Sequence, residues 1–302
     1  MKGESMGIQP LADAYVTVYE SPDPDRVFCY SPGLALMPSG RLIATMDLGG
    51  PGVIDLPGPH AERSEREATW QGRIYTSDDQ GTTWNFRSTF PFLHARPFIA
   101  DGVVYVLGHA GDLMITRSDD QGETWSEPVR LTEGDTWHQA PCNVHYAHDC
   151  VYLVMEKRLY HGIETWPVGE LAPVLMRGRV DADLTRGSSW TFASALPFYD
   201  VVDGVEDEPD LDDFGVPFYA CPYPRGSEVA PGRTCVALGR TCVAPGRTCA
   251  PIGWLETNVV QFTDPDHVWY DPSERTFHLW MRAHTGGTGY ACVAKVVEQG
   301  DQ

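Results

Sequence analysis

Short apolar runs separated by turn-forming residues recur along most of the chain, and their length predicts β-strands rather than helices. The first set predicts four strands, with a Pro-Ser-Gly turn after the first and a long excursion before the third: 31–37, 41–47, 72–77 and 84–90. In the second set, Asp101-Gly102 stands between two apolar runs and predicts a β-hairpin. The strands of this set are 96–100, 103–108, 113–118 and 125–131.

Two further sets follow with the same rhythm. The third predicts strands at 142–146, 150–156, 173–180 and 190–195. The fourth predicts strands at 256–262, 267–270, 277–282 and 290–297, and it lacks an outermost strand. The run Ala14–Tyr19 predicts one more strand ahead of the first set.

An octapeptide occurs twice, as SDDQGTTW from residue 77 and SDDQGETW from residue 118, a separation of 41 residues. Asp at the third position accepts hydrogen bonds from nearby amides, and Gly at the fifth adopts a positive φ, so both suit a tight turn. The final Trp supplies an apolar plane that packs against a neighbouring sheet. We therefore predict structural roles for Ser77, Asp79, Gly81, Trp84, Ser118, Asp120, Gly122 and Trp125.

The pattern S-x-D-x-G-x-T-W, matched at every defined position in both copies, resembles the Asp-box of the sialidase (BNR repeat) superfamily of β-propellers. The resemblance implies an all-β fold, a β-propeller of four-stranded antiparallel blades, and a period near forty residues is typical of such blades. Three full sets and part of a fourth do not close a ring. We expect one partial domain over residues 1–302, with about four blades of an expected six or seven.

Residues 196–252 interrupt the rhythm with an acidic, Pro-rich stretch and a tandem heptad that carries Cys235, Cys242 and Cys249. Each heptad contains Gly and two contain Pro, which break helices, so a surface insertion is expected. The other five cysteines have no C-x-x-C spacing. We therefore expect no metal site and no cofactor.

The composition restricts the possible partners. Lys plus Arg number 22 against 42 Asp plus Glu, and the net charge of -20 argues against nucleic-acid binding and against anionic membranes. No run of about 18 apolar residues and no basic start followed by an apolar stretch occurs. The chain as given is expected to be cytoplasmic, or secreted or periplasmic if its start is incomplete. The oligomeric state is not predicted.

Blade geometry sorts the polar residues by face. In a four-stranded antiparallel blade, the start of the inner strand and the loop after the second strand share one face, and the turn between the third and fourth strands lies on the other. The octapeptides therefore lie opposite the candidate site. Candidates for substrate binding are Arg96, His109, Arg158, Glu256, Asn258 and Arg282, and candidates for proton transfer are Asp47, His138, Glu156 and His284.

These residue types suit an acidic sugar, because guanidinium groups bind carboxylates bidentately and His or carboxyl groups transfer protons. The resemblance implies three arginines on the substrate carboxylate, an Asp acid/base that Asp47 matches loosely, and a Tyr nucleophile. Sialidases carry Arg-Ile-Pro at the first inner strand, where this chain has Tyr30-Ser31-Pro32, so that arginine is absent. Arg96-Pro97 offers a comparable group one blade later. Structural ion pairs are the alternative role for each arginine, and a salt bridge to Arg158 or Lys157 is the alternative for Glu156.

Three functional hypotheses follow. The first is a sialidase-like glycoside hydrolase, an exo-glycosidase acting on acidic glycans. The second is a polysaccharide lyase for uronic-acid glycans, in which Arg neutralises the carboxylate and His or Tyr removes the C5 proton. The absent arginine and the surplus of His favour this second hypothesis. The third is a propeller that binds glycans without catalysis, since a fold does not fix a function.

Overall fold

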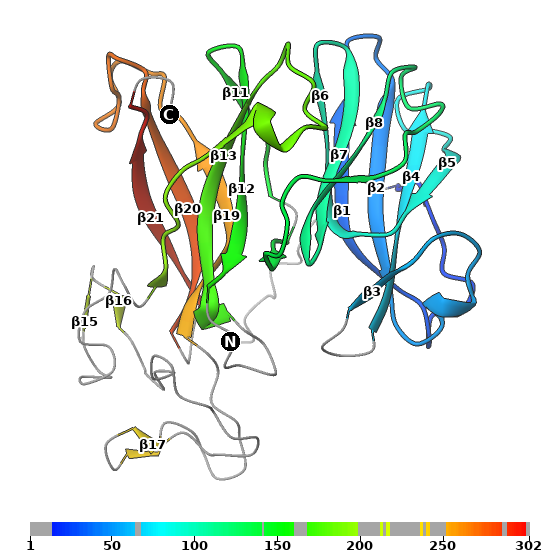
Figure 1. Cartoon of the computed structure of the whole chain (residues 1–302), viewed down its shortest axis with the longest axis horizontal. Helices are drawn as coiled ribbons and strands as arrows, with labels where there is room; N and C mark the ends of the chain where they lie inside the picture. Colours follow the sequence, from blue (N-terminus) through cyan, green and yellow to red (C-terminus); the bar gives the residue numbers. More distant parts are fainter. Residues whose placement is uncertain are drawn as a thin grey trace, which may run out of the picture.

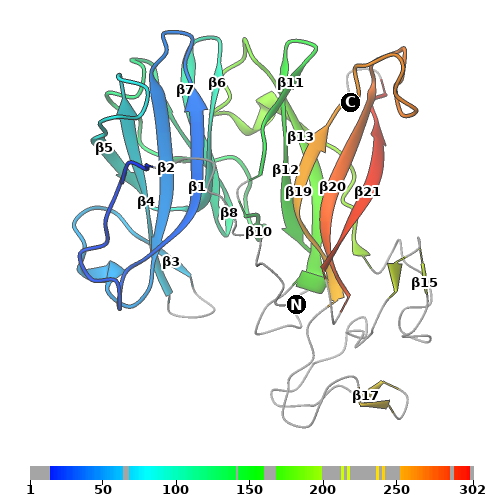
Figure 2. The same ribbon diagram turned by 180° about the vertical axis from the view of Figure 1, so that it is seen from behind.

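The computed structural model describes residues 14–63, 68–140, 142–159, 168–198, 252–285 and 289–299, together with two short strand pairs inside 199–251. Four antiparallel sheets account for the other strands of these residues. The sheets follow one another across the molecule in chain order (Figures 1 and 2), and we name them blades 1 to 4.

Blade 1 contains the two strands that flank the first octapeptide and the long excursion that precedes them. Its ladder runs from β1 through β2 and β4, with β3 and β5 both paired to β4. A short 3-10 helix, η1 (Val53–Asp55), lies in the excursion. The strands are β1 (Phe28–Leu36), β2 (Leu42–Gly49), β3 (Ala61–Arg63), β4 (Ala68–Ser77) and β5 (Asn85–Phe90).

Blade 2 is a regular four-stranded meander in the order β6-β7-β8-β9. The predicted hairpin turn is confirmed, because Asp101 and Gly102 both have positive φ, 47° and 78°. The strands are β6 (Leu93–Ala100), β7 (Val103–Ala110), β8 (Asp112–Ser118) and β9 (Val129–Arg130).

Blade 3 has a divided inner strand. The sequence predicts one run at 142–146, but β10 and β11 pair separately with β12, with a register gap between the two ladders. Two 3-10 helices, η2 (Val168–Glu170) and η3 (Gly187–Ser189), precede its last two strands. The strands are β10 (Trp137–His138), β11 (His145–Ala147), β12 (Cys150–Arg158), β13 (Leu171–Arg179) and β14 (Trp190–Phe192).

Blade 4 has three strands, β19 (Ile252–Val260), β20 (Thr276–Thr285) and β21 (Gly289–Val297). Two predicted strands are wrong. Residues 267–270 form turns, and the Trp269 ring stacks on His278 of β20 with centroids 5.1 Å apart. Residues 14–19 do not form a strand either.

The insertion predicted at 196–252 lies largely outside the described residues, as do its three heptad cysteines. Between residues 199 and 251 the structure describes only two short ladders. One pairs β15 (Asp212–Asp213) with β16 (Val216–Pro217), and the other pairs β17 (Val236–Ala237) with β18 (Arg240–Thr241). Of the cysteines in the described residues, Cys29, Cys142, Cys150 and Cys292 are free thiols.

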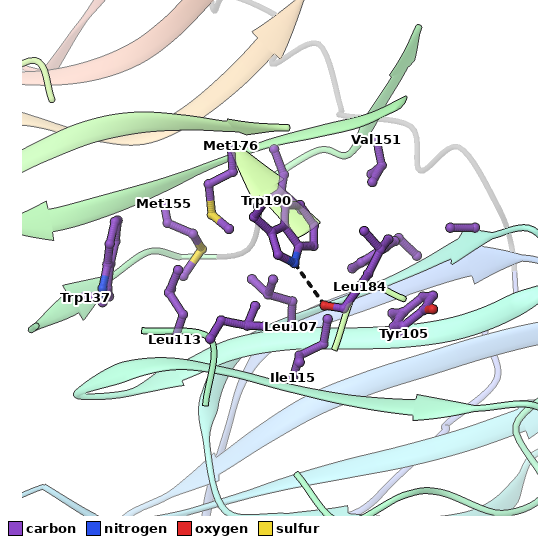
Figure 3. Close-up of a cluster of buried hydrophobic side chains, with 14 of the residues drawn as sticks. Tyr105, Leu107, Leu113, Ile115, Trp137, Val151, Met155, Met176, Leu184 and Trp190 are labelled. Atoms are coloured by element: carbon purple, nitrogen blue, oxygen red, sulfur yellow. Dashed lines mark hydrogen bonds between the residues drawn. The ribbon is translucent and has the colours of Figure 1, made fainter. Parts of the chain in front are cut away.

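Apolar side chains between the blades form the core. Figure 3 shows the cluster between blades 2 and 3, where Leu107 and Ile115 meet Met155 and Met176 with all four side chains buried. Trp190 lies among these side chains, and its indole N–H donates to the Leu184 carbonyl at 2.9 Å. Equivalent clusters join blades 1 and 2 and blades 3 and 4. The protein is therefore an all-β fold of antiparallel propeller-type blades.

The two octapeptides form the same hydrogen-bonded turn. In the first, the Asp79 carboxylate accepts the Thr83 amide at 2.8 Å and the Thr83 hydroxyl at 2.7 Å, and the Trp84 indole donates to the Gly81 carbonyl at 3.0 Å. The second copy repeats each of these bonds, and Gly81 and Gly122 share a φ of 86°. The degenerate copy in blade 3 differs, because its Trp190 indole reaches six residues back.

Strand register places the octapeptides away from the candidate site. Ser77, where the first octapeptide begins, is paired with Leu42 at the start of β2. Asp47, near the end of β2, is paired with Tyr30 and Gly72. Five residues of β2, a length of about 17 Å, therefore separate the end of the blade that carries the octapeptide from the end that carries Asp47. The first octapeptide and Asp47 thus lie at opposite ends of blade 1, as the blade geometry predicts.

Candidate functional site

Three histidines meet where the inner strands of blades 2 and 3 begin. His94 is the second residue of β6, His109 is the last residue but one of β7, and His138 lies in β10. The Nδ1 of His94 and the Nε2 of His109 are 2.9 Å apart, and the His94 and His138 ring centroids are 4.9 Å apart. A contact of 2.9 Å between ring nitrogens requires one to donate and the other to accept. Two protonated imidazolium rings are therefore incompatible with it.

Asp47 borders this cluster from blade 1. Its carboxylate Oδ2 accepts the His94 backbone N–H at 2.5 Å, and the side chain is fully buried. Burial raises the pKa of Asp47 from its usual 3.8 to about 8, although hydrogen bonds from His94, Ser31 and Ala95 act in the opposite direction. Asp47 thus carries a proton at neutral pH.

Glu156 borders the cluster from blade 3. It lies opposite His138 in the ladder between β10 and β12, and its Oε2 is 3.1 Å from His138 Nδ1. The Glu156 side chain is fully buried, whereas the His138 side chain is 14% exposed. This carboxylate fixes the orientation of the imidazole, which is the arrangement that general acid/base histidines use.

Arg96 is buried between β6 and β12 rather than in an open binding site. It is fully buried, and its Nη2 donates to the Val154 carbonyl and contacts the Met155 sulfur of β12. Burial lowers the pKa of Arg96 to about 10, and the nearby charges of Cys142 and Glu156 oppose that change. Arg96 therefore acts as a buried positive charge close to Glu156, and the described structure gives no support to direct contact with a ligand.

The other two candidate arginines are engaged in ion pairs. Arg158 is buried, and its Nε donates to Glu170 at 2.8 Å. Arg282 is 42% exposed and pairs with Glu256 at 3.1 Å. Each of the three arginines has a protein partner of its own, and no contact in the described residues joins them into one carboxylate-binding group. The salt bridge proposed for Glu156 with Arg158 or Lys157 is replaced by the contact with His138.

The remaining candidates have structural contacts or lie beyond description. Asn258 accepts the Asn143 amide at 3.0 Å and donates to the Glu256 carbonyl at 3.2 Å, so it joins blades 3 and 4. Glu256 has a positive φ of 57° at the bulge in β19. The backbone of His284 pairs with Gly253, but its side chain lies outside the described residues.

Two residues of this region were missed as candidates. His94 lies two residues before the predicted strand 96–100, and its contact with His109 depends on a bulge in β6 between Leu93 and Arg96 that the sequence pattern does not reveal. Its positive φ of 54° marks the same irregularity. Glu170 was missed because it follows a segment without a strand pattern. Only the general excess of His at one face could have indicated the cluster.

A large cleft lies elsewhere, on the octapeptide side between blades 3 and 4. It has a volume of about 810 Å³ and is lined by Arg177, Arg179 and Glu298 among others. Arg177 pairs with Glu298 at 2.9 Å and Arg179 pairs with Asp181 at 2.9 Å. Two arginines of the cleft are thus held in ion pairs. We place the candidate site instead at the histidine cluster, where buried acids and imidazoles meet.

Other kinds of site find no support in the described ranges. There, no group of three or more His, Cys, Asp or Glu side chains has the arrangement of a metal site. No helix in the same ranges has the length and apolar character needed to cross a membrane.

Comparison with known proteins gives structural similarity only. No protein-family model and no curated protein matches the chain. Among solved structures, an α-L-arabinanase from Penicillium chrysogenum in complex with arabinobiose is 12% identical, with a TM-score of 0.46 over 94% of this chain and 66% of the arabinanase. A Hadza microbial sialidase is 15% identical, with a TM-score of 0.47 over 88% of this chain and 44% of the sialidase. An α-L-arabinofuranosidase from Lactobacillus brevis is 10% identical, with a TM-score of 0.45 over 91% of this chain and 75% of that protein.

Proposed function

We propose that this protein is a glycoside hydrolase whose proton-transfer groups are His138, Glu156 and Asp47. The contact between His138 and buried Glu156, beside a carboxyl that is protonated at neutral pH, carries the proposal. Glycosidases need one acid for the leaving oxygen and one base for the attacking group, and different surroundings of two carboxyls separate these roles. Asp47 holds the proton of the acid, and Glu156 orients His138, which is partly exposed, toward the substrate.

A more specific form of this proposal is that the substrate is an acidic sugar. Of the three arginines, Arg282 is the one with an exposed side chain, and a sugar carboxylate would compete with Glu256 for it. Arg96 and Arg158 support the site through buried charge rather than through contact with the ligand. An aryl glycoside of sialic acid and a neutral aryl glycoside, assayed side by side, test this preference.

A uronic-acid lyase is the second candidate, and the cluster of three imidazoles favours it. In that reaction a His takes the C5 proton, the bond from C4 to its oxygen breaks, and the electron pair forms the C4–C5 double bond. The leaving oxygen takes a proton from a neighbouring acid, for which Asp47 is the candidate. Ultraviolet absorbance of an unsaturated uronide, measured with polyuronate substrates, distinguishes this reaction from hydrolysis.

The decisive variant is Glu156→Gln, which keeps the volume and removes the negative charge beside His138. We expect the turnover number to fall about 10²- to 10⁴-fold, the usual contribution of a positioned acid/base group. Glu274→Gln is the matched control, because Glu274 lies in the opposite-face cleft. Unchanged turnover in a folded Glu156→Gln variant would exclude this site. Glycan binding without turnover in the wild type would favour the non-catalytic alternative.

A further inference from the structure

We propose that Phe28, Tyr30 and Trp70 form an aromatic subsite on blade 1 that stacks against a ring of the glycan. The inference deepens the proposed function and rests on it. The Tyr30 and Trp70 ring centroids are 5.4 Å apart and those of Phe28 and Tyr30 are 6.5 Å apart, so the three rings form one continuous surface.

Strand register places this surface beside the candidate acid. Tyr30 lies directly opposite Asp47, and Phe28 lies opposite Gly49. Residues directly opposite one another in an antiparallel ladder project from the same face of the sheet. Asp47 reaches the His94 amide of blade 2 from that face. The aromatic rings therefore share the face and the end of the sheet that carry the acid.

Two consecutive glycines at the end of β2 make room for the rings. A Cβ on Gly49 would lie 2.6 Å from Cζ3 of Trp70, so the indole lies directly against the backbone there. A Cβ on Gly50 would lie 2.8 Å from Cδ2 of Phe28, and Gly50 has a φ of 107° that favours glycine. The Trp70 Nε1 is buried without a hydrogen-bond partner among the described atoms, so packing fixes the indole.

The rings remain accessible despite this close packing. Tyr30 is 42% exposed and Phe28 is 37% exposed, next to the fully buried Asp47. Exposed aromatic surface beside buried polar groups is typical of ligand sites, where apolar contacts hold the ligand and a few polar groups orient it. A sugar presents an apolar face of C–H groups, and a rigid aromatic plane offers the matching surface. A glycan ring is therefore the ligand that suits both the rings and the acid.

Phe86 provides a matched comparison within the same blade. It is 53% exposed, but it packs on Tyr75 and lies under the Arg73 guanidinium, 5.6 Å from the ring centroid. Tyr75 is one residue from Ile74, which packs toward blade 2, so Tyr75 and Phe86 lie on the opposite face of the sheet. Both faces of the blade 1 sheet therefore carry exposed aromatic rings, but only the face with Phe28 and Tyr30 also carries Asp47.

The test measures the binding of sialyllactose, oligogalacturonides and arabinobiose by calorimetry and by tryptophan fluorescence. We expect Trp70→Ala and Tyr30→Ala each to weaken the binding of whichever probe the wild type binds, by roughly tenfold. Tyr30→Phe, which keeps the ring, and Phe86→Ala should bind within about twofold of the wild type. Gly49→Ala, which keeps every ring but displaces Trp70, should weaken binding as well.

The outcomes separate the subsite from the catalytic proposal. Wild-type affinity in folded Trp70→Ala and Tyr30→Ala variants would overturn the subsite, even if Glu156→Gln abolishes turnover. Loss of affinity in these variants would support the subsite, even if no probe is turned over. Failure of the wild type to bind any of the three probes would overturn it. Circular dichroism of each variant establishes that the blades are folded.

Discussion

Asp47 stores a proton inside the protein at neutral pH, and this has a cost that depends on pH. Burial raises the pKa of its carboxyl from 3.8 to about 8, so between these values the folded chain retains a proton that the unfolded chain has lost. The contribution of this group to stability is full below about pH 4 and is lost as the pH rises to about 8. A tenfold difference in proton affinity between the folded and unfolded chains corresponds to about 1.4 kcal/mol.

We therefore expect Asp47→Asn, which cannot ionise, to gain stability relative to the wild type as the pH increases. The difference in unfolding free energy should grow by a few kcal/mol between about pH 4 and pH 8, the interval that separates the unfolded and folded pKa values of Asp47. Denaturant unfolding at several pH values measures it. Parallel stability profiles for the two proteins would show that Asp47 is not a buried acid.

The interaction partners of the candidate arginines could not be predicted from the sequence pattern. Their concentration at one face of the predicted blades is visible in the sequence, but each guanidinium finds its partner through tertiary structure. Arg158 pairs with Glu170 across a segment without strand pattern, and Arg96 turns under β12 to a backbone carbonyl. Candidate positions are thus predictable from strand ends, whereas their partners require the packing of one blade on the next.

At the scale of elements, the octapeptide turn also connects neighbouring blades. Arg41 donates to Asp78 of the first octapeptide at 2.6 and 2.8 Å, and to Glu123 of the second at 2.5 Å. Gly122 packs against blade 1, where an added Cβ would lie 2.9 Å from Cδ1 of Ile43. The repeated turn therefore shapes its own hairpin and also fixes the spacing between two sheets.

Two glycine substitutions separate the backbone strain of a turn from its packing against the neighbouring blade. Gly40→Ala places a Cβ at a φ of 89° with no atom within 4 Å, so we expect a loss of about 1 kcal/mol from backbone strain alone. Gly122→Ala, at a φ of 86°, should cost about 1–3 kcal/mol more, because the Cβ meets Ile43. Denaturant unfolding compares them, and equal losses would mean that the turn does not press on blade 1.

The predicted elements agree with the structure where a turn is specified by interactions within its own few residues. The octapeptides and Asp101-Gly102 specify turns through their own side chains and backbone, and the strands around them followed. The predicted strand at 14–19 had the apolar alternation but no neighbouring strand to pair with in the described structure. In the segment 267–270, His267 stacks on Phe262, just beyond β19, and Trp269 stacks on His278 of β20, and neither joins a ladder. The spacing of apolar residues alone does not distinguish aromatic residues in a strand from aromatic residues that pack on a sheet from a turn.

At the scale of the whole molecule, stability depends on the clusters between blades. Leu107→Ala removes a fully buried side chain from the cluster that joins blades 2 and 3, and we expect it to cost roughly 2–5 kcal/mol. Leu36→Ala makes the same change at a side chain that is 65% exposed, and it should stay within about 0.5 kcal/mol of the wild type. Thermal and denaturant unfolding compare the pair, and similar losses would indicate that the blades do not pack as described.

The divided inner strand of blade 3 has a consequence for the relation between blades 3 and 4. Where β10 and β11 separate, the Asn143 side chain takes the part of a peptide group: its oxygen accepts the Val259 amide at 2.9 Å and its nitrogen donates to the Val259 carbonyl at 2.6 Å. A side-chain amide thus links two sheets by hydrogen bonds, although the sheets share no ladder. This link lies only five residues beyond His138, so blade 4 is anchored to blade 3 close in the chain to the histidine cluster.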